Sequence, residues 1–171
     1  MEITRDIAFN TNKRDVFDTL SSNRVFTRFI DLLIFAMSIG IVHDQRQKPT
    51  GEEKIEVARN TIVQPRLKRS LDFLFQTAIL TTSDIQEKID EDTRMRLAFN
   101  DEYEIEGFDK MNFLLEFAPY GLDLIDQKIL DKDPVNAVLN LNEFFEGLFE
   151  DQNIKDELIQ EIISSESKKN L

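Results

Sequence analysis

The chain of 171 residues contains no cysteine and no tryptophan, and its only histidine is His43. Without cysteine the protein can form neither disulfide bonds nor thiolate metal sites. A single histidine cannot supply the paired Glu-x-x-His motifs of a di-iron site in a helical bundle. No glycine-rich loop with the spacing of a phosphate-binding motif occurs either. We therefore predict that the protein is not an enzyme and has no catalytic residue, no metal site and no cofactor.

Glycine and proline are also scarce, with five and four residues respectively. These numbers are too small for a turn-rich all-β fold. Fourteen phenylalanines and a hydrophobic share of 41% instead predict a folded chain rather than a disordered one. The length suits one domain. We expect a single helical domain over residues 1–171, with a loosely packed arm at 1–12 and a frayed tail at 166–171.

The longest apolar run spans residues 26–42 (FTRFIDLLIFAMSIGIV). Its large apolar residues recur at steps of three and four, which places them on one face of a helix. Asp31 interrupts the run and charged residues follow it, so the uninterrupted part is shorter than the ~20 residues that cross a bilayer. The sequence therefore predicts a buried central helix near residues 26–42 and no membrane partner. Gly40, near its end, would either allow another helix to approach closely or begin the exit from the helix.

Helix start signals and apolar periodicity predict further helices along the chain. Pro65 suits a first helical turn, and Asp133 followed by Pro134 is a cap and a proline at a helix start. Two pairs have the spacing of a capping box, namely Thr50 with Glu53 and Ser83 with Gln86. The expected fold class is all-α, a single-domain bundle of about seven to nine helices. The expected segments are 13–20, 26–42, a weak helix at 51–60, 65–80, 83–100 with a charged patch at 90–96 that can break it, 108–118, 121–130, 133–149 and 153–165.

Two of the expected helices share a short pattern. Residues 33–36 (LIFA) are followed by Gly40, and residues 115–118 (LEFA) are followed by Gly121. An internal duplication would produce such an echo. The distance to the glycine differs by one residue, however, and Leu, Phe and Ala are common in helical cores. We therefore favour chance as the origin of the echo.

The net charge of −12 is distributed unevenly. Residues 1–80 carry 12 basic and 10 acidic residues, whereas residues 81–171 carry 9 basic and 23 acidic residues. The acidic half should be repelled by nucleic acid and by anionic membranes, and it would suit a basic protein partner. The alternative, which we favour, is a solvated acidic surface. The acidic runs at 90–92 and 101–106 are interpreted in the same way, because paired acids catalyse only when burial separates their pKa values.

One segment, residues 59–69 (RNTIVQPRLKR), concentrates basic residues. It could contact phosphates, pair with the acidic half of the same chain, or pair with an acidic partner. We favour pairing within the chain or with a protein partner, because the apolar residues of the helix after Pro65 are needed for the core and leave no exposed polar residues to read bases. With Asp31 added, the candidate partner-binding residues are Asp31, Arg46, Lys48, Arg59, Arg66, Lys68 and Arg69.

Asp31 is included because a carboxylate within an apolar helix must find a partner or lie at an interface. Arg28, one turn earlier, could pair with it, as could a basic residue from the loop after Val42. His43 lies at the end of the same helix, where it could interact with the terminal carbonyl groups.

The segment 29–40, with Asp31, Phe35-Ala36 and Gly40 followed by a basic loop, resembles small helical accessory proteins of bacterial defence islands. The nearest are those associated with DNA phosphorothioation systems. Residues 97–99 (LAF) and 113–121 (FLLEFAPYG) add to the resemblance. It implies a non-catalytic subunit that works beside an ATPase or nuclease in an anti-phage system, and it carries over no catalytic residue.

We therefore expect a cytoplasmic, non-catalytic adaptor subunit of a multi-protein complex, whose partners are proteins. The oligomeric state stays open. Two alternatives remain from other classes of protein. One is a nucleic-acid-associated regulator that uses the basic region 46–69, and the other is an acidic inhibitor that mimics DNA through residues 81–171.

Overall fold

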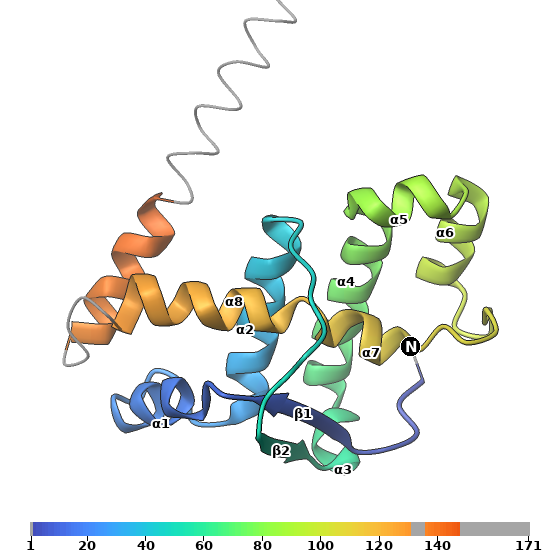
Figure 1. The fold of residues 1–171 in the computed structure, drawn as a ribbon. Helices are drawn as coiled ribbons and strands as arrows, with labels where there is room; N and C mark the ends of the chain where they lie inside the picture. The colour runs from blue at the N-terminus through green and yellow to red at the C-terminus, as the bar shows by residue number, and fades with distance from the viewer. Residues whose placement is uncertain (1, 131–135, 148–171) are drawn as a thin grey trace, which may run out of the picture.

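The computed structural model of the protein describes residues 2–130 and 136–147. This part of the chain is mostly helical and contains one small two-stranded sheet (Figure 1). Residues 137–147 are helical as well. In chain order, the other elements are β1 (Ile7–Thr11), α1 (Arg14–Ser22), α2 (Phe29–Val42), β2 (Glu53–Val57), α3 (Arg59–Ile62), α4 (Pro65–Thr81), α5 (Ser83–Lys88), α6 (Glu91–Phe99), α7 (Lys110–Leu115), α8 (Ala118–Ile125) and the π-helix η1 (Asp126–Leu130).

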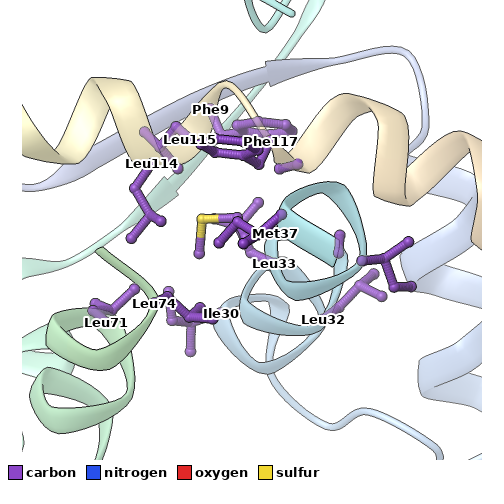
Figure 2. Packing of buried hydrophobic residues seen from close by; sticks show 14 of the residues in the cluster. Phe9, Ile30, Leu32, Leu33, Met37, Leu71, Leu74, Leu114, Leu115 and Phe117 are labelled. Atoms are coloured by element: carbon purple, nitrogen blue, oxygen red, sulfur yellow. The ribbon is translucent and has the colours of Figure 1, made fainter. Parts of the chain in front are cut away.

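Helix α2 is buried along most of its length, because nine of its fourteen residues lie in the core. It contacts α8 on one side and α4 on another. Figure 2 shows Leu33 and Met37 between side chains of α4, such as Leu71, and side chains of α7 and its C-terminal end, such as Leu114 and Phe117. Each fully buried side chain of this size contributes about 1.5–3 kcal/mol through removal of apolar surface from water.

Two glycines allow the backbones of α2 and α8 to meet. A Cβ atom built on Gly40 would lie 2.9 Å from the carbonyl carbon of Phe117, and one built on Gly121 would lie 2.6 Å from the carbonyl carbon of Ala36. Real Cβ atoms do not approach backbone atoms so closely. The close approach expected from Gly40 is therefore present, and it is matched by a second glycine on the partner helix.

The two strands correct the all-α prediction. β1 and β2 pair antiparallel, with Ile7 opposite Val57 and Phe9 opposite Ile55. Alternate residues of β1 are buried, namely Ile7, Phe9 and Thr11. Residues 7–11 are thus a paired strand rather than part of the loosely packed arm predicted for 1–12. The physical reason is the period of two in this segment, which suits a strand with one buried face.

The weak helix predicted for residues 51–60 is also wrong. Residues 53–57 form β2, and the chain turns helical only at Arg59 in the short α3. Ile55 and Val57 are β-branched and alternate with charged residues, which suits a strand. The capping box predicted for Thr50 and Glu53 therefore does not exist, because no helix starts there.

Helix α4 follows the prediction closely. It runs from Pro65 to Thr81, with the proline in its first turn, and the predicted range was 65–80. The six apolar residues that recur at steps of three and four are all buried: Leu67, Leu71, Leu74, Phe75, Ala78 and Ile79. A strong amphipathic period over four turns was enough to define both the element and its buried face.

The helix predicted for 83–100 is two helices, α5 and α6, which meet at Asp90. Asp90 is the N-cap of α6, and its carboxylate accepts hydrogen bonds from the backbone nitrogen and the hydroxyl of Thr93 at 3.0 and 2.7 Å. The charged patch therefore does break the helix. The capping box of Ser83 and Gln86 is wrong, since the N-cap of α5 is Thr82 and makes no side-chain cap bond.

The helix predicted for 108–118 ends early. α7 stops at Leu115, and a second helix, α8, begins at Ala118 with Pro119 in its first turn. The proline thus starts a helix here rather than following the end of one. The predicted start at Asp133-Pro134, the segment 153–165 and the tail 166–171 lie outside the described residues, as does the end of the helix predicted for 133–149.

No helix among residues 2–130 and 136–147 is long and apolar enough to span a membrane.

Substitution of either buried glycine should destabilise the protein strongly. We expect Gly40→Ala and Gly121→Ala each to lower the free energy of unfolding by ~3 kcal/mol or more, because the new methyl group meets backbone that cannot move aside. The measurement is urea denaturation followed by circular dichroism. The matched control is Gly147→Ala, where the added Cβ meets nothing within 4 Å and should change the stability by about 1 kcal/mol or less. Equal effects at all three glycines would contradict the close approach.

The cap of α6 gives a pH-dependent prediction. Hydrogen bonds from Thr93 lower the pKa of Asp90 below its usual 3.8. A lowered pKa means that the cap stabilises the folded chain above the usual value and that this contribution is lost as the pH falls through the lowered pKa. We therefore expect the melting temperature of Asp90→Ala to lie below that of the wild type at neutral pH, and the gap to close below pH 3.8.

The control for this measurement is Asp92→Ala in the first turn of the same helix, whose side chain is 75% exposed. Its gap to the wild type should be small at neutral pH. A gap for Asp90→Ala that stays constant from neutral to acidic pH would show that the carboxylate does not cap α6.

Candidate functional site: an acidic cleft beside the sheet

A cleft of about 1040 Å³ lies between two segments that are far apart in the sequence. One wall is formed by residues 2–8, which lead into β1, together with Lys54 and Glu56 of β2. The other wall is formed by residues 104–112, with Asp101 and Leu115. In Figure 1 the first described residues lie beside the segment that leads into α7. The volume is at the upper end of the range typical of ligand-binding pockets.

The first wall is held in position by Arg59 at the start of α3. Its backbone nitrogen donates a hydrogen bond to the carboxylate of Asp6 at 2.7 Å, and its Nε donates to the carbonyl oxygen of Ile3 at 2.8 Å. Ile3 is buried below this contact. Pairing of β1 with β2 continues the same wall. Residues 3–11 are therefore fixed by one arginine and one strand.

The second wall is a loop that hydrogen bonds to itself and to α7. The side-chain oxygen of Asn100 accepts from the nitrogen of Glu102 at 3.0 Å, and the carbonyl of Ile105 accepts from the nitrogen of Phe108 at 3.0 Å. Asp109 is the N-cap of α7. These bonds give the loop before α7 a defined shape, and the first turn of α7 completes the wall.

Apolar side chains line part of the cleft. Ile105, Phe108 and Met111 are half-buried there and pack against the core. The ring of Phe108 lies 5.4 Å from the ring of Phe113 and 6.5 Å from that of Phe75, measured between centroids. The ring cluster therefore fixes an apolar surface within a cleft whose remaining lining is charged.

Carboxylates outnumber cations in the lining of the cleft. Seven acidic residues face three basic ones: Glu2, Asp6, Glu56, Asp101, Glu104, Glu106 and Asp109 against Arg5, Lys54 and Lys110. Because like charges gathered in one hollow add their potentials, the cleft should attract cations and repel anions.

Some of these charges neutralise one another. Lys54 pairs with Glu56 at 2.5 Å, and Arg5 pairs with Asp109 at 2.6 Å across the cleft. Glu104 and Glu106 are exposed and form no ion pair with any residue in the described ranges. The loop wall therefore presents two carboxylates that are available to a positively charged ligand.

A second polar cluster surrounds Arg46, in the loop after α2. Its guanidinium donates to the carboxylates of Asp84 and Glu116, with 3.1 Å to Glu116, and lies 4.9 Å from the ring centroid of Phe113. The backbone nitrogen of Gln47 donates to the carbonyl of Glu116 at 2.8 Å. This cluster fastens the loop between α5 and the end of α7, so Arg46 is used within the chain.

The neighbouring Asp44 supports the same loop. Its carboxylate accepts hydrogen bonds from the backbone nitrogen of Ser83 at 3.2 and 3.4 Å, at the start of α5. The hollow between this loop and residues 82–84 is smaller, at about 320 Å³. Since its charged groups bind one another, it is a joint between elements rather than a candidate ligand site.

The other predicted partner-binding residues are spread over the molecule. Arg28 donates two hydrogen bonds to the carboxylate of Asp31, both of 2.7 Å, as one of the predicted pairings proposed. Lys68 pairs with Asp72 at 2.9 Å, and this hydrogen bond raises the pKa of Lys68. Contact of Asp31 and Lys68 with a partner stays a prediction.

Lys48, Arg66 and Arg69 are exposed, and the Nε of Arg69 donates to the carbonyl of Pro65 at 3.2 Å. Among the seven predicted residues, only Arg59 takes part in building the cleft, and it does so from behind the wall. The structure does not gather the seven into one site.

Sequence reasoning missed the cleft for two reasons. The acidic run at 101–106 predicts a solvated surface, and nothing in its local pattern indicates that it faces a distant segment. Arg5 and Asp109 were not considered, because the strand that brings Arg5 to this position was predicted as a loose arm. The alternation of Ile3, Ile7 and Phe9 was the signal that could have revealed the strand.

Comparison of the chain with protein-family models, with curated proteins and with solved structures finds no match. In the described part of the chain, no group of three or more His, Cys, Asp or Glu side chains could hold a metal ion.

The role of Arg46 can be measured. We expect Arg46→Met to lower the free energy of unfolding by about 2 kcal/mol, because Asp84 and Glu116 lose their common cation in a partly buried place. Chemical denaturation measures this value. Lys48→Met, two residues away and exposed, serves as the control and should change stability by less than about 0.5 kcal/mol. An equal loss in both variants would refute a fastening role for Arg46.

Proposed function

We propose that this protein is a non-catalytic adaptor subunit that binds a basic segment of a partner protein in its acidic cleft. The observation that carries the proposal is the lining of the cleft, in which seven acidic residues and three basic ones surround apolar side chains. Lysine and arginine combine a charged head with an aliphatic stem, so a basic segment fits a hollow that is acidic and apolar at once.

The helical scaffold supports this function because it fixes both walls of the cleft. α7, whose cap is Asp109, packs against α4, and β1 is paired with β2. In this proposal α2 is the centre of the scaffold and the whole chain acts as one cytoplasmic domain. The resemblance to accessory proteins of defence islands extends the proposal to an anti-phage complex, in which the partner is an ATPase or a nuclease.

The nucleic-acid alternative has less support. Four of the seven basic residues in region 46–69 already have partners within the chain: Arg46, Lys54, Arg59 and Lys68. Lys48, Arg66 and Arg69 stay exposed. A gel shift at two salt concentrations separates the alternatives, because phosphate binding weakens steeply with salt.

The adaptor proposal is tested by reversing charge in the cleft. We expect the double variant Glu104→Lys/Glu106→Lys to capture at least ten-fold less partner from the native host than the wild-type chain does. The reason is that the net charge of the cleft changes by about four units. The measurement is quantitative mass spectrometry of the captured proteins.

The control is Glu87→Lys/Glu146→Lys, which changes the net charge equally at two exposed positions outside the cleft. This variant should retain the partner. Loss of the partner in both variants, or in neither, would refute binding through the cleft, provided that circular dichroism gives the same melting temperature for the two.

A further inference from the structure

The ion pair between Arg5 and Asp109 crosses the cleft from one wall to the other. Nη2 of Arg5 donates to Oδ2 of Asp109 at 2.6 Å, and the two residues lie in distant parts of the sequence. The side chains of Arg5 and Asp109 are 70% and 39% exposed. Ion pairs at this level of exposure contribute little to stability and are screened by salt. The pair is therefore easy to separate without unfolding the chain.

The two oxygens of Asp109 have different tasks. Oδ1 accepts a hydrogen bond from the backbone nitrogen of Asn112 at 2.9 Å and caps α7, whereas Oδ2 accepts from Arg5. Another guanidinium can replace Arg5 at Oδ2 while the cap stays intact. Asp109 is in this way a fixed carboxylate that presents one oxygen to the cleft.

We propose that Arg5 occupies the position of an arginine side chain of the partner, and that binding of an arginine-rich segment displaces Arg5 from Asp109. This proposal rests on the proposed function, because it takes the cleft as the binding site. Glu104 and Glu106 lie on the same wall and have no cation from the described part of the chain. The apolar surface of Phe108 and Met111 is available to the aliphatic stem of an incoming arginine.

The consequence is a competition within the chain. An incoming arginine gains a bond to Asp109 only after the bond of Arg5 has broken, so Arg5 lowers the affinity of the free protein for its partner. The competition also disfavours a ligand that carries a single lysine. The lysine ammonium is a point charge, whereas the planar guanidinium of arginine offers several donors that can replace those of Arg5.

The experiment uses a synthetic peptide that alternates arginine and alanine over about ten residues, which extends to ~33 Å. Its dissociation constant for the full chain is measured by fluorescence anisotropy at about 50 and about 300 mM salt. We expect the wild type to bind, and Arg5→Ala to bind about five-fold more tightly at about 50 mM salt. The gain should be smaller at about 300 mM, because salt screens the competing ion pair. Arg96→Ala removes the same charge and also breaks an exposed ion pair, that of Arg96 with Asp92, outside the cleft. It should change the constant by less than about 1.5-fold.

A second variant separates displacement from simple loss of charge. Asparagine caps helices as well as aspartate does, so Asp109→Asn should leave α7 intact. In this background the competition is absent, and we expect Arg5→Ala to change the dissociation constant by less than about 1.5-fold. A five-fold gain in both backgrounds would overturn the proposal, because the gain would then come from net charge alone.

Failure of this inference differs from failure of the proposed function. If the peptide binds and Glu104→Lys/Glu106→Lys abolishes binding, but Arg5→Ala has no effect, the cleft is a site and Arg5 does not compete in it. If neither the wild type nor Arg5→Ala binds the peptide, an arginine-rich partner is excluded. The native partner in the co-purification experiment then decides separately whether the cleft binds protein.

Discussion

The contact on which the structure depends is the crossing of α2 and α8, where two backbones touch with almost no side chain between them. Gly40 faces the backbone of Phe117, and Gly121 faces that of Ala36. Because each helix supplies a glycine to the other, neither can be shifted along its axis without bringing a Cβ atom into the contact. The crossing fixes α8, and through it the preceding α7 and the position of Asp109. A buried backbone contact therefore helps to position a surface residue of the cleft.

Charged residues serve two purposes in this molecule, and the difference lies in their surroundings. Arg46, Arg59 and Lys13 connect segments that are distant in the sequence, and Lys13 bonds to Asp126 of η1 at 2.5 Å. This hydrogen bond raises the pKa of Lys13, so its stabilising effect is present through neutral pH and is lost only above the usual value of 10.5. Around the cleft, by contrast, carboxylates outnumber the cations that could neutralise them. The uneven charge of the sequence thus has a structural role in these contacts, and the proposed function gives the acidic cleft a binding role as well.

Much of the fold was predictable from the sequence where the signal is local. The buried face of α4 and the pairing of Asp31 with Arg28 depend on residues within a few turns of one another. The pairing of the two strands was not predictable in this way, because β1 and β2 have five residues each and are far apart in the chain, although the alternation in β1 is a local signal. The cleft was missed with the sheet, since its first wall continues β1. Residues 33–40 and 115–121, whose similar pattern we attribute to chance, lie against each other in the structure, and the glycine of each segment contacts the backbone of the other.

The two walls of the cleft come from segments far apart in the sequence, and the exposed ion pair of Arg5 with Asp109 joins them across the gap. A ligand that bridges both walls would take over this connection and would bind only where the walls are correctly spaced. Binding and folding are then thermodynamically linked, and the linkage amounts to about 2.7 kcal/mol when the ligand is present at a hundred times its dissociation constant. In a complex, the partner would act as a clamp that protects the chain from proteolysis, while the free chain would open more often at this seam.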